Sequence, residues 1–275
     1  MSIRMDRRGF LAKAAAVFGA ATLGGCDRLA ETAFGRRALK MGEDANLFVQ
    51  RLLLTPASLA TEFPDSAISS YFKPNGSTDP QDTDYLALVK AEFSGYRLAV
   101  DGLVETPLAL SLPELRALPS RTQVTRHDCV EGWSSIGKWT GVPLADLLQK
   151  ARLKPNARYV VFHCFDTMEF AGGGLEGGDG ADSGDGQPQG RPIRYYESLD
   201  LTDAYHPQTI LAYAMNGETL GVPHGAPLRL RVERQLGYKQ AKYLRRVEVV
   251  ESLGRFGDGQ GGYWEDRGYE WYAGI

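Results

Sequence analysis

The chain has 275 residues, which is enough for one or two domains with a buried core, and its composition is that of an ordinary globular protein. Its formal net charge of −3 gives no sign of the basic face that nucleic-acid-binding proteins present, so we expect no nucleic-acid partner. Beyond the N-terminus, no stretch approaches the ~20 apolar residues that a membrane-spanning helix needs. Three cysteines are too few for a scaffold built on disulfides.

The N-terminus has the pattern of an export signal. Arg7 and Arg8 come just before a weakly apolar segment, rich in alanine and glycine, that runs from Ala14 to Leu23. This order is typical of a twin-arginine signal, which directs proteins across the cytoplasmic membrane already folded, commonly with a cofactor inside. A short amphipathic helix that happens to carry two arginines is the alternative. We therefore expect residues 1–26 to be a signal and the protein to be periplasmic.

The signal ends at Cys26, which follows two glycines as in the lipobox of bacterial lipoproteins. Lipidation of Cys26 would tether the protein to the membrane, and Asp27 resembles the residue that retains some lipoproteins at the inner membrane. Cleavage nearby, with Cys26 as a chance cysteine, is the alternative. Residues 27–45 are predicted to be a linker, and residues 46–275 to form the globular catalytic domain.

The globular part combines many predicted strands with few short helices. The first expected elements are a short helix or extended segment at 46–54, a hairpin at 96–104 that turns on Asp101-Gly102, a helix from the capping box Ser111–Glu114 to about 118, and a helix from Pro143 to before Pro155. The later ones are a strand at 158–165, a surface loop at 171–192, a hairpin on Asn216-Gly217, and strands at 228–232 and 247–249. Because strands and helices do not alternate regularly, the sequence predicts a β-rich α+β domain.

Two cysteines remain in the predicted domain. Cys129 lies in a polar, glycine-containing passage that runs from Arg126 to Ser134, whereas Cys164 lies in an apolar strand. A soft thiolate is a natural ligand for a transition metal, so Cys129 is the candidate metal ligand and Cys164 a small buried hydrophobe. A disulfide between them is the alternative in an oxidising compartment. The sequence has no CxxC, HExxH or CxxCH pattern, so zinc, iron–sulfur and c-type haem sites are unsupported.

The passage from Cys129 to Ser134, followed by Trp139 to Leu144, resembles the molybdenum-binding motif of the sulfite-oxidase superfamily. The resemblance is closest to its single-domain branch, which includes the periplasmic methionine sulfoxide reductase catalytic subunit. It implies a sulfite-oxidase-type molybdopterin-binding fold in which the thiolate of Cys129 and the dithiolene of one pyranopterin bind molybdenum. Because the chain has no haem motif, the resemblance also implies a separate cytochrome or quinone-linked protein as electron-transfer partner.

Two further segments resemble those with which this family holds the pterin. The first runs from His224 to Arg229, and the second from Gly237 through Tyr238 to Lys239. By this resemblance Arg229 pairs with a phosphate, Gly237 lets the backbone approach closely, and Lys239 adds positive charge. The chain departs from the family pattern at His224, where the family has asparagine, and at Tyr238, where it has phenylalanine.

Weaker matches complete the resemblance. Thr167 matches a family threonine near the cofactor. Asn46, Val49 and Gln50 match a pocket segment of the form Asn-x-x-Tyr-Glu, but Val49 and Gln50 lack the phenol and the carboxylate.

Arg229 and Arg231 also have an interpretation that involves no cofactor, as the solvated face of an edge strand. For Arg231 this interpretation is favoured.

The resemblance implies two-electron oxygen-atom transfer on a small-molecule substrate. We expect reduction of an S- or N-oxide; sulfite oxidation is one alternative, and a non-catalytic lipoprotein that keeps the fold as a binding module is another. Arg126 is the arginine nearest before Cys129, and His224 can be neutral at pH 7, so the site should favour a neutral oxide over a dianion. The aromatic residues at 263–272 are expected to pack as a tail; a place in the active-site wall or contact with a partner is the alternative.

Overall fold

The chain divides into two compact units, and the boundary between them falls after Leu53. The predicted signal, Cys26 and most of the predicted loop at 171–192 lie outside the part of the chain that the computed structural model describes. None of the described helices combines the length and the apolar character that crossing a membrane requires. The described residues are 32–55, 58–171 and 190–275.

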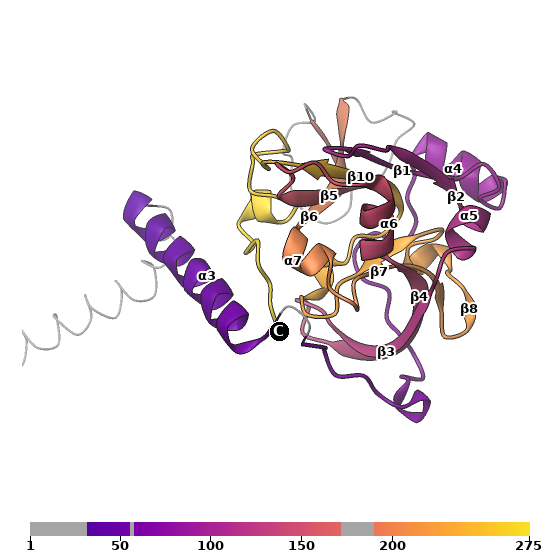
Figure 1. The fold of residues 1–275 in the computed structure, drawn as a ribbon, viewed down its shortest axis with the longest axis horizontal. Coiled ribbons are helices and arrows are strands. Elements are labelled where there is room, and N and C mark those ends of the chain that lie inside the picture. The colour runs from indigo at the N-terminus through magenta and orange to yellow at the C-terminus, as the bar shows by residue number, and fades with distance from the viewer. Residues whose placement is uncertain (1–31, 56–57, 172–189) are drawn as a thin grey trace, which may run out of the picture. The chain divides into compact units, whose positions relative to one another are not determined.

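The first unit contains helix α3, which runs from Ala33 to Leu53 (Figure 1). This helix covers the predicted linker at 27–45 from Ala33 onward, and residues 46–53 are its last turns. The segment is helical because of its composition: it contains no proline and is rich in Ala, Leu and Arg. Their helix propensity outweighs the cost of two internal glycines.

The second unit is built on two sheets (Figure 1). The first has the order β2-β1-β10-β5-β6, in which β1 is parallel to β10 and the other neighbours are antiparallel. The second has the order β3-β4-β7-β8, and β9 also pairs with β7. The strands are β1 Arg97–Gly102, β2 Leu108–Ser111, β3 Arg121–Asp128, β4 Ser134–Pro143, β5 Tyr159–Ala171, β6 Arg191–Asp200, β7 Ile210–Met215, β8 Glu218–Thr219, β9 Arg229–Arg231 and β10 Leu244–Val250.

Short helices connect and cover the sheets. Helix α6 contacts β1 of the first sheet and β4 of the second, and its apolar face is fully buried in the main core. Leucines three and four residues apart create this face, so burial of that stripe stabilises the contact between the sheets. The helices are α4 Thr83–Lys90, α5 Leu112–Arg116, α6 Leu144–Ala151 and α7 Leu201–Ala204, with 3₁₀ turns η1 Asp65–Ala67, η2 Val222–His224, η3 Gly237–Lys239 and η4 Glu265–Arg267.

Most local predictions are confirmed. The β-rich α+β class holds, the capping box between Ser111 and Glu114 starts α5, and the strands at 158–165 and 247–249 are parts of β5 and β10. The Asn216-Gly217 turn joins β7 to β8, with both residues at positive φ as a type I′ turn requires.

The hairpin turn predicted at Asp101-Gly102 is wrong. Both residues belong to β1, and the chain turns further on, before β2. Gly102 has a φ of +87°, and a Cβ there would collide with the backbone of Val249 on β10. Glycine is therefore needed for the close approach of the two strands and not for a tight turn.

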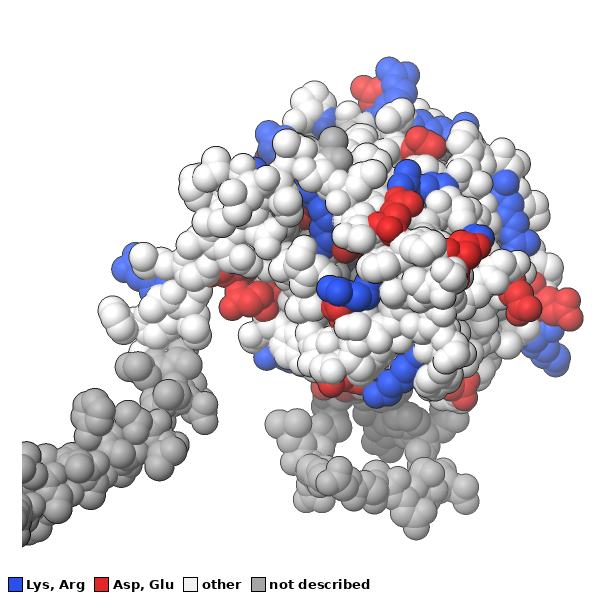
Figure 2. Space-filling view, turned by 90° about the horizontal axis from the view of Figure 1, so that it is seen from below, with Lys and Arg blue, Asp and Glu red and all other residues white. Residues whose placement is uncertain are grey.

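Charged side chains are interspersed on the face seen in Figure 2, where neither sign forms a continuous stripe. This distribution agrees with the small net charge of −3. On this face, at least, the basic stripe expected of a nucleic-acid-binding surface is missing.

Candidate active site

Cys129 directly follows β3 and is held in a tight turn. Its N–H donates to the carbonyl of Trp133 (3.0 Å), and the N–H of Gly132 donates to the carbonyl of Cys129 (3.0 Å). Gly132 has a φ of +84°, which favours glycine. The turn thus fixes the side chain of Cys129, which is 9% exposed, in the wall of a cavity of about 270 Å³. We call this space the Cys129 cavity.

Cys164 does not line this cavity. It lies on β5 in the main core, 1% exposed, and both it and Cys129 are free thiols, so the alternative of a disulfide is wrong. Burial raises the pKa of the Cys164 thiol well above its usual value. These facts agree with its assignment as a small buried hydrophobe.

Segments that are distant in the sequence form the Cys129 cavity. One wall is aromatic: Trp264 stacks on Tyr269 with ring centroids 5.2 Å apart, and Tyr238 meets Tyr269 edge-on at 5.2 Å. The packed tail expected at the C-terminus is confirmed for Tyr263 and Tyr272, which are buried, but Trp264 and Tyr269 belong to the cavity wall. The remaining lining residues are Asn75, Gly76, Ser77, Val130, Glu131, Asp166, Met168, Tyr195, Gly237, Gln240, Ala241 and Lys242.

Among the described residues, two neighbouring buried cations form no ion pair with a carboxylate: Lys242, in the wall of the Cys129 cavity, and Arg229, outside its lining. Lys242 donates to the carbonyls of Asn75 (2.6 Å), Pro223 (3.1 Å) and Ser77, and Arg229 donates to the carbonyl of His224 (2.9 Å). Burial and Arg231 lower the pKa of Arg229 to about 9, while burial and Arg229 lower the pKa of Lys242 to about 7. Placing two cations so close together without a counter-ion costs free energy, which an anionic ligand would recover.

A buried carboxyl faces the same space. Asp166, on β5, lines the Cys129 cavity, and its Oδ1 has no hydrogen-bond partner. Burial raises the pKa of Asp166 to about 7, against the attraction of Lys242. This group can therefore hold a proton at neutral pH.

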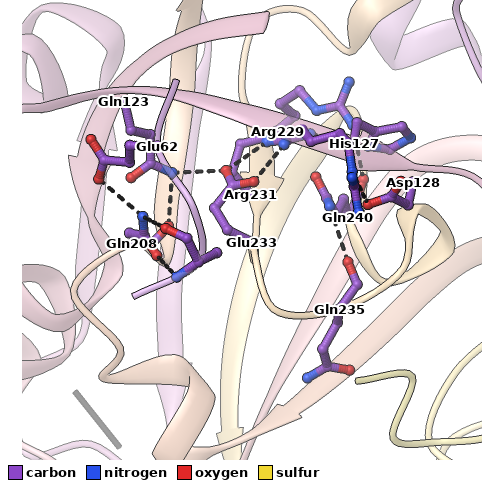
Figure 3. Close-up of polar contacts among 12 residues, drawn as sticks. Glu62, Gln123, His127, Asp128, Gln208, Arg229, Arg231, Glu233, Gln235 and Gln240 are labelled. Atoms are coloured by element: carbon purple, nitrogen blue, oxygen red, sulfur yellow. Dashed lines mark hydrogen bonds and ion pairs between the residues drawn. The ribbon is translucent and has the colours of Figure 1, made fainter. Parts of the chain in front are cut away.

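His127, two residues before Cys129, is held by a buried polar network (Figure 3). Nη1 of Arg231 lies 3.1 Å from Nδ1 of His127, and Arg231 also pairs with Glu233 at 2.6 Å. Burial and the charge of Arg231 lower the pKa of His127 well below its usual value. Because a guanidinium only donates, Nδ1 must accept, and the proton of the neutral ring is on Nε2.

The same network runs on to the surface of the second unit (Figure 3). Glu233 accepts from the amide of Gln123 (2.8 Å), which also donates to the carbonyl of Gln208 (3.0 Å). The amide of Gln208 in turn donates to Glu62 (2.9 Å). Through this chain of hydrogen bonds, residues that do not touch His127 help to hold the orientation of its ring.

The favoured assignment of Arg231 to a solvated face is wrong, as is the same alternative for Arg229. Both are fully buried and lie over the ring of Trp139, with guanidinium carbons 4.4 and 4.9 Å from its centroid. The strand alternation was read correctly, but Trp139 and the polar network cover the face that was expected to meet solvent.

Lys239 lies outside the lining of the Cys129 cavity. It is fully buried and pairs with Glu265 (2.5 Å) and with Glu197. Its neighbours Gly237 and Tyr238 do line the cavity, and Gly237 permits a close contact, because a Cβ there would lie 2.5 Å from Nε2 of His127. Sequence reasoning thus located the right turn but missed the residues after it, Gln240 to Lys242.

The other predicted site residues are spread more widely. Thr167 lies on β5 between Asp166 and Met168, which both line the cavity while Thr167 does not. His224 ends η2 with Nδ1 unpartnered, and burial lowers its pKa. Asn46, Val49 and Gln50 lie on α3 in the first unit, so their place in the pocket stays a prediction.

Comparison with known proteins adds independent findings. Residues 85–254 match the family described as the oxidoreductase molybdopterin binding domain. A putative protein-methionine-sulfoxide reductase subunit YedZ1 from Azospira oryzae is 36% identical over 271 residues, which is 98% of this chain and 87% of the relative. The protein-methionine-sulfoxide reductase catalytic subunit MsrP from Gluconobacter oxydans is 36% identical over 157 residues, 57% of this chain and 47% of the relative.

The match to the second relative thus spans about half of that protein's length. The sulfane dehydrogenase SoxCD from Paracoccus pantotrophus, known from a crystal structure, is similar with a TM-score of 0.45 and 24% identity, over 58% of this chain and 39% of that one.

The residues at the Cys129 cavity fit a molybdopterin. Its phosphate needs cations. Lys242 in the cavity wall and its neighbour Arg229 are buried without a described ion pair to a carboxylate, and Nε of Arg229 has no hydrogen-bond partner among the described residues. Its metal needs a soft ligand in addition to the pterin sulfurs, and Cys129 is a free thiol in the cavity wall.

Proposed function

Because the chain belongs to the oxidoreductase molybdopterin-binding domain family, and is thus a molybdopterin-dependent oxidoreductase, we propose that it reduces a neutral sulfoxide, such as methionine sulfoxide. The names of two relatives, both methionine-sulfoxide reductase subunits, support this substrate class. The relative named as a catalytic subunit favours an enzyme over a non-catalytic binding module.

The chain's own residues have distinct parts in this reaction. When bound, the molybdenum cofactor supplies two-electron oxygen-atom transfer. Cys129 would ligate the metal as a thiolate, and Arg229 and Lys242 would neutralise the phosphate of one pterin. Tyr238, Trp264 and Tyr269 would exclude water from the bound sulfoxide.

The observation that carries the proposal is the charge of the cavity wall. Among the described residues that line the Cys129 cavity there is no arginine, and Lys242 is its one cation. Arg126, the arginine closest to Cys129 in sequence, pairs with Asp128 (2.9 Å) and lines a different cavity. A wall with so little fixed positive charge suits a neutral oxide better than the sulfite dianion.

Reduction of a sulfoxide to a thioether and water takes up two electrons and two protons. Asp166, with a pKa raised to about 7, can supply a proton from within the Cys129 cavity. The electrons come from a separate cytochrome or quinone-linked protein, since the chain has no haem-binding CxxCH motif. We place the enzyme in the periplasm, exported through the twin-arginine signal at residues 1–26 and tethered by lipid at Cys26.

Steady-state kinetics on metal-replete protein test the substrate. We expect faster turnover of methionine sulfoxide with a reduced dye than of sulfite with an oxidised one. An N-oxide of similar size serves as a second neutral substrate. A clear preference for sulfite would overturn the proposal and favour a sulfite dehydrogenase that uses the same cofactor.

A further inference from the structure

A second cavity, of about 590 Å³, lies beside β5, β6 and β10 in the second unit. We call it the arginine cavity, because its described lining contains arginines and no carboxylate. Tyr195 lines both this space and the Cys129 cavity, so the two share a wall. Its arginines are Arg191, Arg194, Arg245, Arg246 and Arg255.

Carboxylates that do not line the arginine cavity neutralise part of the positive charge of its arginines. Glu248 is central, because it is 5% exposed and pairs with two of the arginines. The ion pairs are Arg194 with Asp82 (2.5 Å), Arg246 with Asp101 (2.8 Å) and with Glu248 (2.8 Å), and Arg255 with Glu248. Three carboxylates thus balance three guanidinium groups.

Arg191 and Arg245 carry the charge that is left over. Within the described ranges neither has an acidic partner; Arg245 lies over the ring of Phe165 at 5.3 Å, and Arg191 begins β6 at the surface. His163 lines the same cavity, but burial lowers its pKa, so it adds little charge at pH 7. The cavity therefore has two arginines that form no ion pair with a described carboxylate.

We propose that the arginine cavity binds a phosphate or sulfate group. Guanidinium groups match such oxyanions because each can donate two parallel N–H···O bonds, and two arginines without a described ion pair suit a dianion. The volume of about 590 Å³ leaves room for an organic part attached to that group. Neither relative's name assigns a ligand of this kind.

The site is distinct from that of the molybdopterin phosphate. Arg229 and Lys242, which would hold that phosphate, do not line the arginine cavity. The holoenzyme is therefore the right material, because its cofactor already occupies the other anion site. The rim of the arginine cavity meets solvent, since the Arg255 side chain is 62% exposed, so salt will weaken the binding.

Calorimetric titration of the holoenzyme with inorganic phosphate at low ionic strength tests the proposal. We expect a dissociation constant on the order of 1 mM and similar binding of sulfate. Arg245→Gln should weaken both by roughly tenfold, because a hydrogen bond to a charged group is lost. Arg191→Gln should act in the same direction, and because Arg191 is exposed its replacement leaves the core intact.

Arg97→Gln is the matched control, because it removes an arginine on β1 that pairs with Glu114 outside the cavity. Its phosphate affinity should equal that of the unaltered protein. Nitrate at equal ionic strength should not bind measurably, which separates a dianion site from general attraction.

Side-chain nitrogen NMR locates the site. The Nε–H signals of Arg191 and Arg245, assigned through the two variants, should shift with phosphate, while that of Arg97 should not. The proposal is overturned if phosphate does not bind, if all three variants bind it equally, or if nitrate binds as well as phosphate.

Discussion

At the scale of single residues, the two cysteines of the second unit have opposite environments. Cys129 sits in a tight polar turn at the wall of a cavity, whereas Cys164 is packed inside the core on β5. The contrast in sequence context was enough to predict which cysteine is packed in the core, because an apolar strand favours burial and a polar, glycine-containing passage does not.

Exchange of each cysteine for serine separates these roles. Cys129→Ser should abolish activity and molybdenum retention with the fold intact, because a hydroxyl is a poor ligand for this metal and the residue packs little apolar surface. Cys164→Ser should retain metal but lose about 1–3 kcal/mol of unfolding free energy, since it buries a hydroxyl among apolar groups. Metal analysis and thermal unfolding of both proteins provide the measurement. Equal metal loss in the two variants would contradict the assignment.

At the scale of elements, local sequence patterns predicted the structure correctly where tertiary packing did not impose a different arrangement. The Asn216-Gly217 turn was predicted correctly, because its positive φ angles are a local requirement. The similar Asp101-Gly102 pair failed, because the parallel strand β10 requires Gly102 for close approach. Both faces of β9 are buried, because Trp139, from a different strand, lies against the arginines on the face that was expected to meet solvent, and no pattern within β9 contains that fact.

A second prediction concerns Lys239, in the η3 turn. Lys239 is the one described cation between Glu197 and Glu265, which are both buried. Lys239→Met should lower the unfolding free energy by about 3–5 kcal/mol, because it leaves two buried carboxylates without a counter-charge. Denaturant unfolding of cofactor-free protein measures this.

Two further variants sharpen that experiment. Lys242→Met removes a cation that forms no ion pair with a described carboxylate, so it should cost much less stability but reduce cofactor content. Adding Glu265→Gln to Lys239→Met should restore part of the lost stability. If Lys239→Met were as stable as the unaltered protein and lost only the cofactor, Lys239 would be a cofactor residue, as the resemblance implied.

At the scale of the whole molecule, the sequence was sufficient for the fold class and for the family, because both depend on patterns within continuous segments. It could not assemble the Cys129 cavity, whose wall joins residues 75–77, the β5 strand and the aromatic residues Trp264 and Tyr269. These segments come together only through the pairing of distant strands. The buried pairing of Lys239 was hidden for the same reason.

The last prediction concerns export of the whole chain. Replacing both Arg7 and Arg8 by lysine keeps the positive charge but removes the guanidinium pair that a twin-arginine signal requires. We expect the variant to remain in the cytoplasm as a folded precursor that contains molybdenum, because the cofactor is loaded before transport. Cell fractionation with metal analysis of the trapped protein measures this.

The matched control replaces Arg36 and Arg37, a second arginine pair further along the chain, by lysine, and it should leave export unchanged. Periplasmic protein in the Arg7 and Arg8 variant would contradict the signal. Cys26→Ala separates the tether from the signal, since it should give an exported protein released from the membrane, and unchanged membrane association would count against lipidation.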